Sequence, residues 1–233
     1  MVSDPPHNRL LACLSRKDLD VLRPDLKAVD LPLRLELEKP AQPIEHVFFP
    51  ETGIASVVAI QSDDTRVEVG LIGCEGMTGL PVILGNHQTP NNTYMQVAGH
   101  GLCIASAALS KAAAKNPGLQ KVFLKYVQAF VVQTSHTAIA NAHGRLDERL
   151  ARWILMAHDR TAGAVIPLTH EFLALMLGVR RAGVTETLHT LVEQGLVKSG
   201  RGEITVLDRK GLERTARDSY GVPEAEYRRL FGK

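Results

Sequence analysis

The sequence predicts an α+β protein with a mainly β N-terminal half, a long central helix and a C-terminal winged helix-turn-helix. Short alternating apolar and polar runs, separated by turn residues, fill residues 29–104 and are typical of an antiparallel sandwich or jelly-roll-like roll. A long apolar stripe at helical spacing follows over residues 109–140. Two short helical patterns and a Gly-rich hairpin pattern then occupy residues 168–207. The 233 residues suit two modest domains, each with its own core.

The composition is that of an ordinary globular protein, with 45% hydrophobic and 22% charged residues. A formal net charge of +2 is too small to indicate nucleic acid by itself, so that inference must rest on where the charges lie. The N-terminus lacks a basic segment followed by an apolar core, and no apolar run approaches the roughly 18 residues that span a bilayer. We therefore expect a cytoplasmic protein with no membrane partner.

The N-terminal half begins with leucines at positions 10–22 among charged residues, which predicts one or two short helices, with Ser15 placed to cap the second. The strands expected after them are residues 31–38, 46–50, 54–60, 66–72 and 93–97. A glycine-dense segment, residues 70–81, follows one of these strands. It is no dinucleotide-binding fingerprint, because no βαβ pattern surrounds it. The simplest interpretation is that these glycines only turn a β-roll.

The longest helical segment covers residues 109–140, and Asn116-Pro117 marks a helix start within it. An apolar stripe of this length needs a partner, and an identical helix from a second copy is the simplest one. The alternative is that the stripe packs on its own β domain, and both can hold on different faces. The stripe comprises Leu119, Val122, Phe123, Tyr126, Val127, Phe130 and Val131, continued by Thr134, Thr137 and Ala138.

A further amphipathic helix is expected over residues 145–160, with Gly144 before it as a hinge between domains. Residues 161–167 form a short link. Thr169 is placed to cap a helix that ends at Gly178, and a second helix runs from Arg181 to Gly195. Two short helices joined in this way, followed by a hairpin over residues 196–207, make a winged helix-turn-helix.

This segment resembles the winged helix-turn-helix of the Crp/Fnr family of bacterial transcription regulators. The residues that carry the resemblance are Leu168-Thr169-His170-Glu171, Leu177-Gly178-Val179-Arg180-Arg181, Val184, Thr187-Leu188, Leu191, Glu193-Gln194-Gly195-Leu196-Val197 and Gly200-Arg201-Gly202-Glu203-Ile204. The resemblance implies a cyclic-nucleotide-binding-like β-roll over residues 1–115, a dimerisation helix over 116–143, a DNA-binding domain over 144–211 and an extension over 212–233 without an assigned role. It also implies a homodimer that binds double-stranded DNA and contacts RNA polymerase.

The expected DNA-binding residues begin with Arg180 and Arg181, at the start of the second helix, which can contact phosphate or pair with guanine O6 and N7. Family members with an Arg-Glu-x-x-x-Arg trio read a TGTGA-like half-site. The matching positions here are Arg181, Ala182 and Glu186, so we expect a different half-site. The remaining candidates on this helix are Thr185 and His189, and the expected phosphate contacts are Thr169, His170, Lys198 and Arg201.

The glycine-dense segment resembles the turn that binds a cyclic nucleotide phosphate in this family. The effector-pocket candidates are Gly73, Glu75, Gly76, Thr78, Gly79, Asn92 and Thr93. Cyclic-AMP binders have Glu where this chain has Met77, and an Arg-Ser pair where it has no arginine, near residues 91–93. Each missing charge-assisted hydrogen bond would forfeit about 1.5–3 kcal/mol. Cyclic AMP is therefore not the expected effector.

Other chemistry has little support in the sequence. An iron–sulfur cluster is not expected, because Cys13, Cys74 and Cys103 provide no four-thiolate cluster, and no metal site or other cofactor is identified. Haem stays open, since one His or Cys can be an axial ligand. His136, His143 and His158 match no metalloenzyme spacing, so no enzyme is expected. The competing hypothesis is a small-molecule-sensing module that acts through a protein partner without reading DNA.

Overall fold

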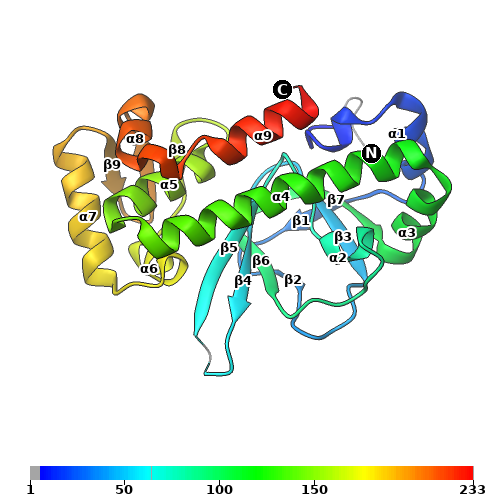
Figure 1. Cartoon of the computed structure of the whole chain (residues 1–233), viewed down its shortest axis with the longest axis horizontal. Helices are drawn as coiled ribbons and strands as arrows, with labels where there is room; N and C mark the ends of the chain where they lie inside the picture. The colour runs from blue at the N-terminus through cyan, green and yellow to red at the C-terminus, as the bar shows by residue number, and fades with distance from the viewer. Residues whose placement is uncertain (1–5, 64, 233) are drawn as a thin grey trace.

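The computed structural model describes residues 6–63 and 65–232. The β-roll lies on one side of the long helix α4 (Pro117–His143), and the helix-turn-helix lies at the C-terminal end of that helix (Figure 1). The α+β architecture with an N-terminal antiparallel roll and a C-terminal winged helix-turn-helix is thus confirmed. Among the described residues, no helix combines the length and hydrophobicity needed to cross a bilayer.

Two antiparallel sheets form the roll. One sheet has the order β1-β7-β3 and the other has the order β2-β6-β4-β5. The strands are β1 (Lys27–Leu31), β2 (Glu36–Glu38), β3 (His46–Pro50), β4 (Ile54–Ile60), β5 (Arg66–Ile72), β6 (Asn92–Val97) and β7 (Gly99–Ala105). The apolar side chains between the sheets include Leu31, Ala55, Ile72 and Met95. The period-two alternation along the strands supplies this buried layer.

The expected single strand over residues 31–38 is wrong, because the chain crosses there from one sheet to the other. β1 ends at Leu31 and β2 begins at Glu36. Arg34 between them has φ +67°, a left-handed conformation that breaks the strand. Alternation continues through this turn, so periodicity alone does not show the break.

The helical segment expected over residues 109–140 is also two helices, α3 (Ser106–Lys115) and α4. Asn116 separates them: it caps α4, and its Nδ2 donates to Asp18 at 2.7 Å. The predicted start at Pro117 is confirmed.

Before the roll, a 3-10 turn (Leu11–Cys13) leads into α1 (Arg16–Leu22), whose predicted cap Ser15 accepts from the backbone N–H of Asp18. The short helix α2 (Leu80–Ile83) follows the glycine-dense turn.

The C-terminal domain contains α5 (Leu146–His158), α6 (His170–Leu177), α7 (Arg181–Glu193) and α8 (Arg209–Ala216). Its sheet has the order β8-β10-β9, formed by β8 (Val165–Ile166), β9 (Val197–Gly200) and β10 (Glu203–Val206). The expected hairpin is present, but the link over residues 161–167 also contributes a strand, β8. A 3-10 turn (Arg217–Ser219) and helix α9 (Val222–Phe231) complete the chain, and α9 lies along α4 (Figure 1).

The core of the C-terminal domain is continuous with one sheet of the roll. Trp153, Ile154 and Leu173 belong to the same buried cluster as Ile54 and Leu71. A second cluster joins the N-terminal helices to the face of α4 that carries Leu119, Phe123 and Tyr126. Much of the predicted stripe on α4 therefore packs on its own β domain.

Candidate nucleic-acid interface

The first helix of the helix-turn-helix, α6, has clear local start and stop signals. The Thr169 hydroxyl accepts from the backbone N–H of Phe172 at 3.2 Å. Gly178 ends the helix with φ +62°, and no atom lies within 4 Å of where its Cβ would be, so glycine is needed there for its backbone and not for space. Leu173, Met176 and Leu177 are buried. The caps and the buried face set the bounds of α6, so α7 begins only after Gly178, at Arg181.

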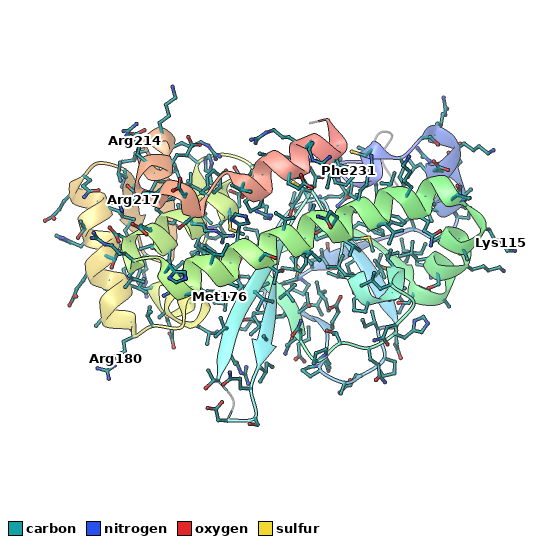
Figure 2. All side chains as sticks on the ribbon, in the orientation of Figure 1. Lys115, Met176, Arg180, Arg214, Arg217 and Phe231 are labelled. Carbon is teal, nitrogen blue, oxygen red and sulfur yellow. The ribbon has the colours of Figure 1, made fainter. Side chains whose placement is uncertain are left out.

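The second helix, α7, buries Val184, Leu188 and Leu191 and exposes a polar face. Arg180 precedes its first turn without a side-chain cap, and Figure 2 shows the Arg180 side chain extending away from the molecule at this end of α7. Arg180 and Arg181 are exposed and form no ion pair with any described residue. Unpaired guanidinium groups at the start of this helix are suited to phosphate or guanine.

The rest of this face is also exposed. Thr185 and Glu186 lie on the next turn, and His189 Nδ1 lies 3.4 Å from Glu193 Oε1 one turn later. Thr185 Oγ1 donates to the backbone carbonyl of Arg181 at 3.1 Å. The face thus presents two cations, a hydroxyl, a carboxylate and an imidazole in sequence along the helix.

His170 links this face to the wing. Its Nδ1 lies 3.0 Å from Thr185 Oγ1 on α7, and its Nε2 lies 3.2 Å from Ser199 Oγ on β9. Both ring nitrogens therefore have partners within the protein. His170 therefore orients α7 relative to the wing. The sequence indicated a phosphate contact for this residue and did not predict this positioning role.

The wing is the hairpin of β9 and β10, in which Glu203 pairs with Gly200 and Val206 pairs with Val197. Gly202 at its tip has φ +77°. Lys198 and Arg201 are exposed and have no ion-pair partner among residues 6–63 and 65–232. The wing and α7 together place four such cationic side chains, Arg180, Arg181, Lys198 and Arg201, on one domain.

The seven effector-pocket candidates separate into three groups in the structure. In the first group, Gly79 and Thr93 both donate to the carboxylate of Glu38. Glu38 Oε1 accepts from the backbone N–H of Gly79, and Oε2 accepts from the Thr93 hydroxyl at 2.8 Å. Burial raises the pKa of Glu38, while the bonds to Gly79 and Thr93 oppose that shift. The donors that could bind an external anion here are therefore used by an internal carboxyl group.

The second group, Thr78 and Asn92, pairs with neighbouring strands and does not point into a shared pocket. Thr78 Oγ1 accepts from the backbone N–H of Phe48 at 3.0 Å, and Asn92 Nδ2 donates to Glu36 Oε1 at 3.1 Å. The Thr78 contact holds the turn to β3, and the Asn92 contact joins β6 to β2 within one sheet.

The third group, Gly73, Glu75 and Gly76, faces α4 and Arg160, just after the end of α5. Glu75 Oε1 lies 2.8 Å from Arg160 Nε in a buried ion pair. A Cβ on Gly76 would lie 1.8 Å from the Tyr126 hydroxyl, and a Cβ on Gly73 would lie 2.8 Å from Arg160 Cβ. These glycines permit close packing of the turn against the two helices, so the structure does not bring the candidates together as one site.

The histidine candidates are dispersed. No group of three His, Cys, Asp or Glu side chains in the described part of the chain could hold a metal ion. His158 Nδ1 lies 2.9 Å from Arg209 Nη1, and burial followed by the Arg209 charge lowers the pKa of His158. His136 and His143 lie on α4.

Known proteins match both the domain and the fold. A family model for the Crp-like helix-turn-helix domain matches residues 148–215. Transcriptional regulator SdrP of Thermus thermophilus is 30% identical over 107 residues, a match that spans 43% of this chain and only 53% of that relative. The structure of FixK2 from Bradyrhizobium japonicum covers 82% of this chain and 98% of its own at 17% identity, with a TM-score of 0.72. TTHA1359, a CRP/FNR-family transcriptional regulator from Thermus thermophilus, covers 83% and 100% at 20% identity, with a TM-score of 0.65.

Residues 148–215 are therefore a Crp-like helix-turn-helix domain, and the chain as a whole has the Crp/Fnr fold. The motifs over residues 168–204 predicted this helix-turn-helix domain and this fold, and both predictions are confirmed.

Proposed function

We propose that this protein is a transcription regulator that binds a pseudo-palindromic DNA operator as a homodimer. The observation that carries the proposal is the set of exposed, unpaired cations at the start of α7 and on the wing, within a Crp-like helix-turn-helix domain. In this arrangement the N-terminal residues of the second helix enter the major groove. Because the net charge of the whole chain is only +2, these cations are a local feature of the helix-turn-helix domain.

The proposed contacts divide by role. Arg181 pairs with a guanine, and Glu186 accepts from cytosine N4 or orients an arginine. Arg180, Lys198, Arg201 and Thr169 contact phosphates and set the register, and Thr185 and His189 complete the helix face toward the groove. We assign His170 a positioning role, because its ring nitrogens already join Thr185 to Ser199.

The exposed side of α4 supports dimerisation. Leu124, Val131 and Ile139 are 42%, 51% and 55% exposed, whereas the opposite set of apolar side chains on the helix, which includes Leu119, Phe123 and Phe130, is buried. Leu124, Val131 and Ala138 recur every seven residues, the spacing of a coiled-coil seam. A second copy of the same helix has the matching stripe, so pairing along α4 places two recognition helices about one helical turn of DNA apart, ~34 Å.

The resemblance to the Crp/Fnr family is the basis of what we propose about location and regulation. We propose that the protein acts in the cytoplasm and contacts RNA polymerase, and that the turn at Gly79 needs no cyclic nucleotide because Glu38 already accepts from Gly79 and Thr93.

Selection of binding sites from a random duplex pool by the purified protein tests the proposal. We expect a two-fold symmetric motif, with affinity that falls steeply as salt rises because several phosphates are neutralised. Arg181→Ala should cost about 1–3 kcal/mol and relax preference at one position in each half-site. Arg214→Ala is the matched control, since it removes the same charge from α8, far from Arg180 (Figure 2).

Absence of an enriched motif, together with DNA affinity that does not vary with salt, would exclude direct DNA reading. That result would favour the sensing module that acts through a protein partner. For the dimer, we expect Val131→Asp to give monomers in sedimentation experiments at concentrations where the wild type is dimeric. A monomeric wild type would contradict pairing along α4.

A further inference from the structure

A cavity of about 340 Å³ lies where the β-roll turn, α4, the end of α5 and the C-terminal helix α9 meet. This volume is within the range of small-molecule sites, roughly 300–1,000 Å³. Phe130 and Tyr126 of α4 and Tyr227 of α9 provide aromatic lining. The cavity is separate from the groups around Gly79 and Thr93, and neither residue lines it.

Arginine dominates the charges of this cavity. Four arginines and three carboxylates line it: Arg9, Arg160, Arg209, Arg228, Glu75, Asp159 and Glu224. Arg160 pairs with Glu75 and Arg209 pairs with Asp159, each at 2.8 Å. Glu224 accepts from the backbone N–H of Gly221 at the start of α9. The exposed side chains of Arg9 and Arg228 form no ion pair with any described residue. Two guanidinium groups at the cavity therefore have no ion-pair partner among the described residues.

Two of the residues that line the cavity, Glu75 and Tyr126, each carry a buried polar atom without an ordinary hydrogen bond in the described part of the chain. Glu75 Oε2 is buried and has no hydrogen-bond partner in the described part of the chain. The Tyr126 hydroxyl is buried beside the Met77 backbone and makes no hydrogen bond of ordinary geometry there. Buried polar atoms are almost always satisfied by protein, water or ligand, so these two atoms mark this region as one where a further hydrogen-bond partner fits.

We propose that this cavity binds a small organic anion that also carries a hydroxyl or amino group. Its carboxylate or phosphate pairs with Arg9 and Arg228, and its hydroxyl or amino group donates to Glu75 Oε2. A ring or other planar body packs against Phe130 and Tyr227. Guanidinium groups bind carboxylate and phosphate in the same forked geometry, so both anions belong to one ligand chemistry.

Occupation of this cavity would connect parts of the chain that are distant in sequence. Tyr227 Oη already donates to the Glu75 carbonyl at 2.8 Å, and Lys125 Nζ donates to the Leu230 carbonyl at 3.1 Å. A ligand that bridges Arg228 to Glu75 adds to these contacts between α9, the β-roll turn and α4. This consequence depends on the proposed function: anion binding then changes the position of the helix-turn-helix and its affinity for DNA.

Calorimetric titration of the full chain with 4-hydroxybenzoate, 4-hydroxyphenyl phosphate and the neutral control phenol tests the binding step. We expect saturable binding of at least one anion and none of phenol; the stronger anion identifies the carboxylate or the phosphate as the preferred group. Arg228→Gln should weaken binding at least tenfold. Arg229→Gln, on the same helix but outside the cavity, should change it less than twofold.

The site is refuted if neither anion saturates, or if the two arginine variants weaken binding equally, which would indicate general charge attraction. DNA affinity is then measured with and without saturating anion at constant ionic strength, where we expect a change of at least threefold. Anion binding with unchanged DNA affinity would overturn the regulatory step alone. Anion binding by a protein that binds no DNA would contradict the proposed function and leave the site intact.

Discussion

The buried carboxyl group of Glu68 makes the stability of this protein depend on pH. Glu68 on β5 is 5% exposed. Its Oε1 accepts from the Trp153 indole N–H on α5 at 2.7 Å, and its Oε2 accepts from the Ser56 hydroxyl at 2.6 Å. Burial raises the pKa of Glu68 to about 7, although these hydrogen bonds and the charges of Arg152 and Arg160 oppose the shift. The group lies between the β-roll and the helix-turn-helix domain.

The magnitude follows from this shift. The pKa of Glu68 rises from 4.5 to about 7 on folding, and each unit corresponds to about 1.4 kcal/mol. Because the folded pKa is the higher one, folding favours the protonated carboxyl. The stabilisation is complete below the unfolded pKa and is lost as pH rises through about 7. The total change is about 3 kcal/mol.

Glu68→Gln tests this reasoning, since the amide keeps an acceptor for Trp153 and cannot ionise. We expect the unfolding free energy of the variant, relative to wild type, to rise by about 1.4 kcal/mol per pH unit between pH ~5 and ~7. Urea titrations followed by fluorescence of Trp153, the single tryptophan, measure it. The exposed Glu203→Gln is the control. Parallel pH dependence in Glu68→Gln and wild type would refute the argument.

Three further substitutions test local packing and capping. Gly76→Ala should destabilise the protein by about 1–3 kcal/mol in chemical denaturation, because the new methyl would overlap the buried Tyr126 hydroxyl; an unchanged midpoint would show that the ring can move. Thr169→Ala should cost about 1 kcal/mol by removing the cap of α6, with Thr169→Ser retaining most of it; equal loss in both would exclude capping. Gly178→Ala should cost about 1 kcal/mol or more through backbone strain alone, since space is available; no loss of thermal stability would contradict this reading.

Local signals were sufficient to predict much of the fold. Ser15, Thr169 and Gly178 act within one or two turns of their own position, so their capping roles follow from residue type and spacing. The roll and the wing follow from period-two alternation between turn residues. The break at Arg34 was missed because a left-handed non-glycine residue has no reliable sequence signal.

Glu38 and Arg160 were not predicted, because each depends on segments that are distant in sequence. Glu38 lies in an alternating strand as an outward-facing charge would, and only the packing of β2 against β6 and the turn brings it to Gly79 and Thr93. Arg160 meets Glu75 across 85 residues. For the candidate pocket residues, residue type indicated only that they can form hydrogen bonds. The tertiary structure determined which partner each of them binds.

The sequence by itself determined the fold class, the helix-turn-helix and its exposed cations, because periodicity, caps and turns are short-range properties of the chain. Tertiary structure alone decided that Glu38 occupies the β-roll turn, that Glu68 joins the two domains through Trp153, and that a cavity rich in arginine forms beside α9. Such contacts depend on how whole elements pack, and packing places side chains by long-range geometry that residue spacing does not encode.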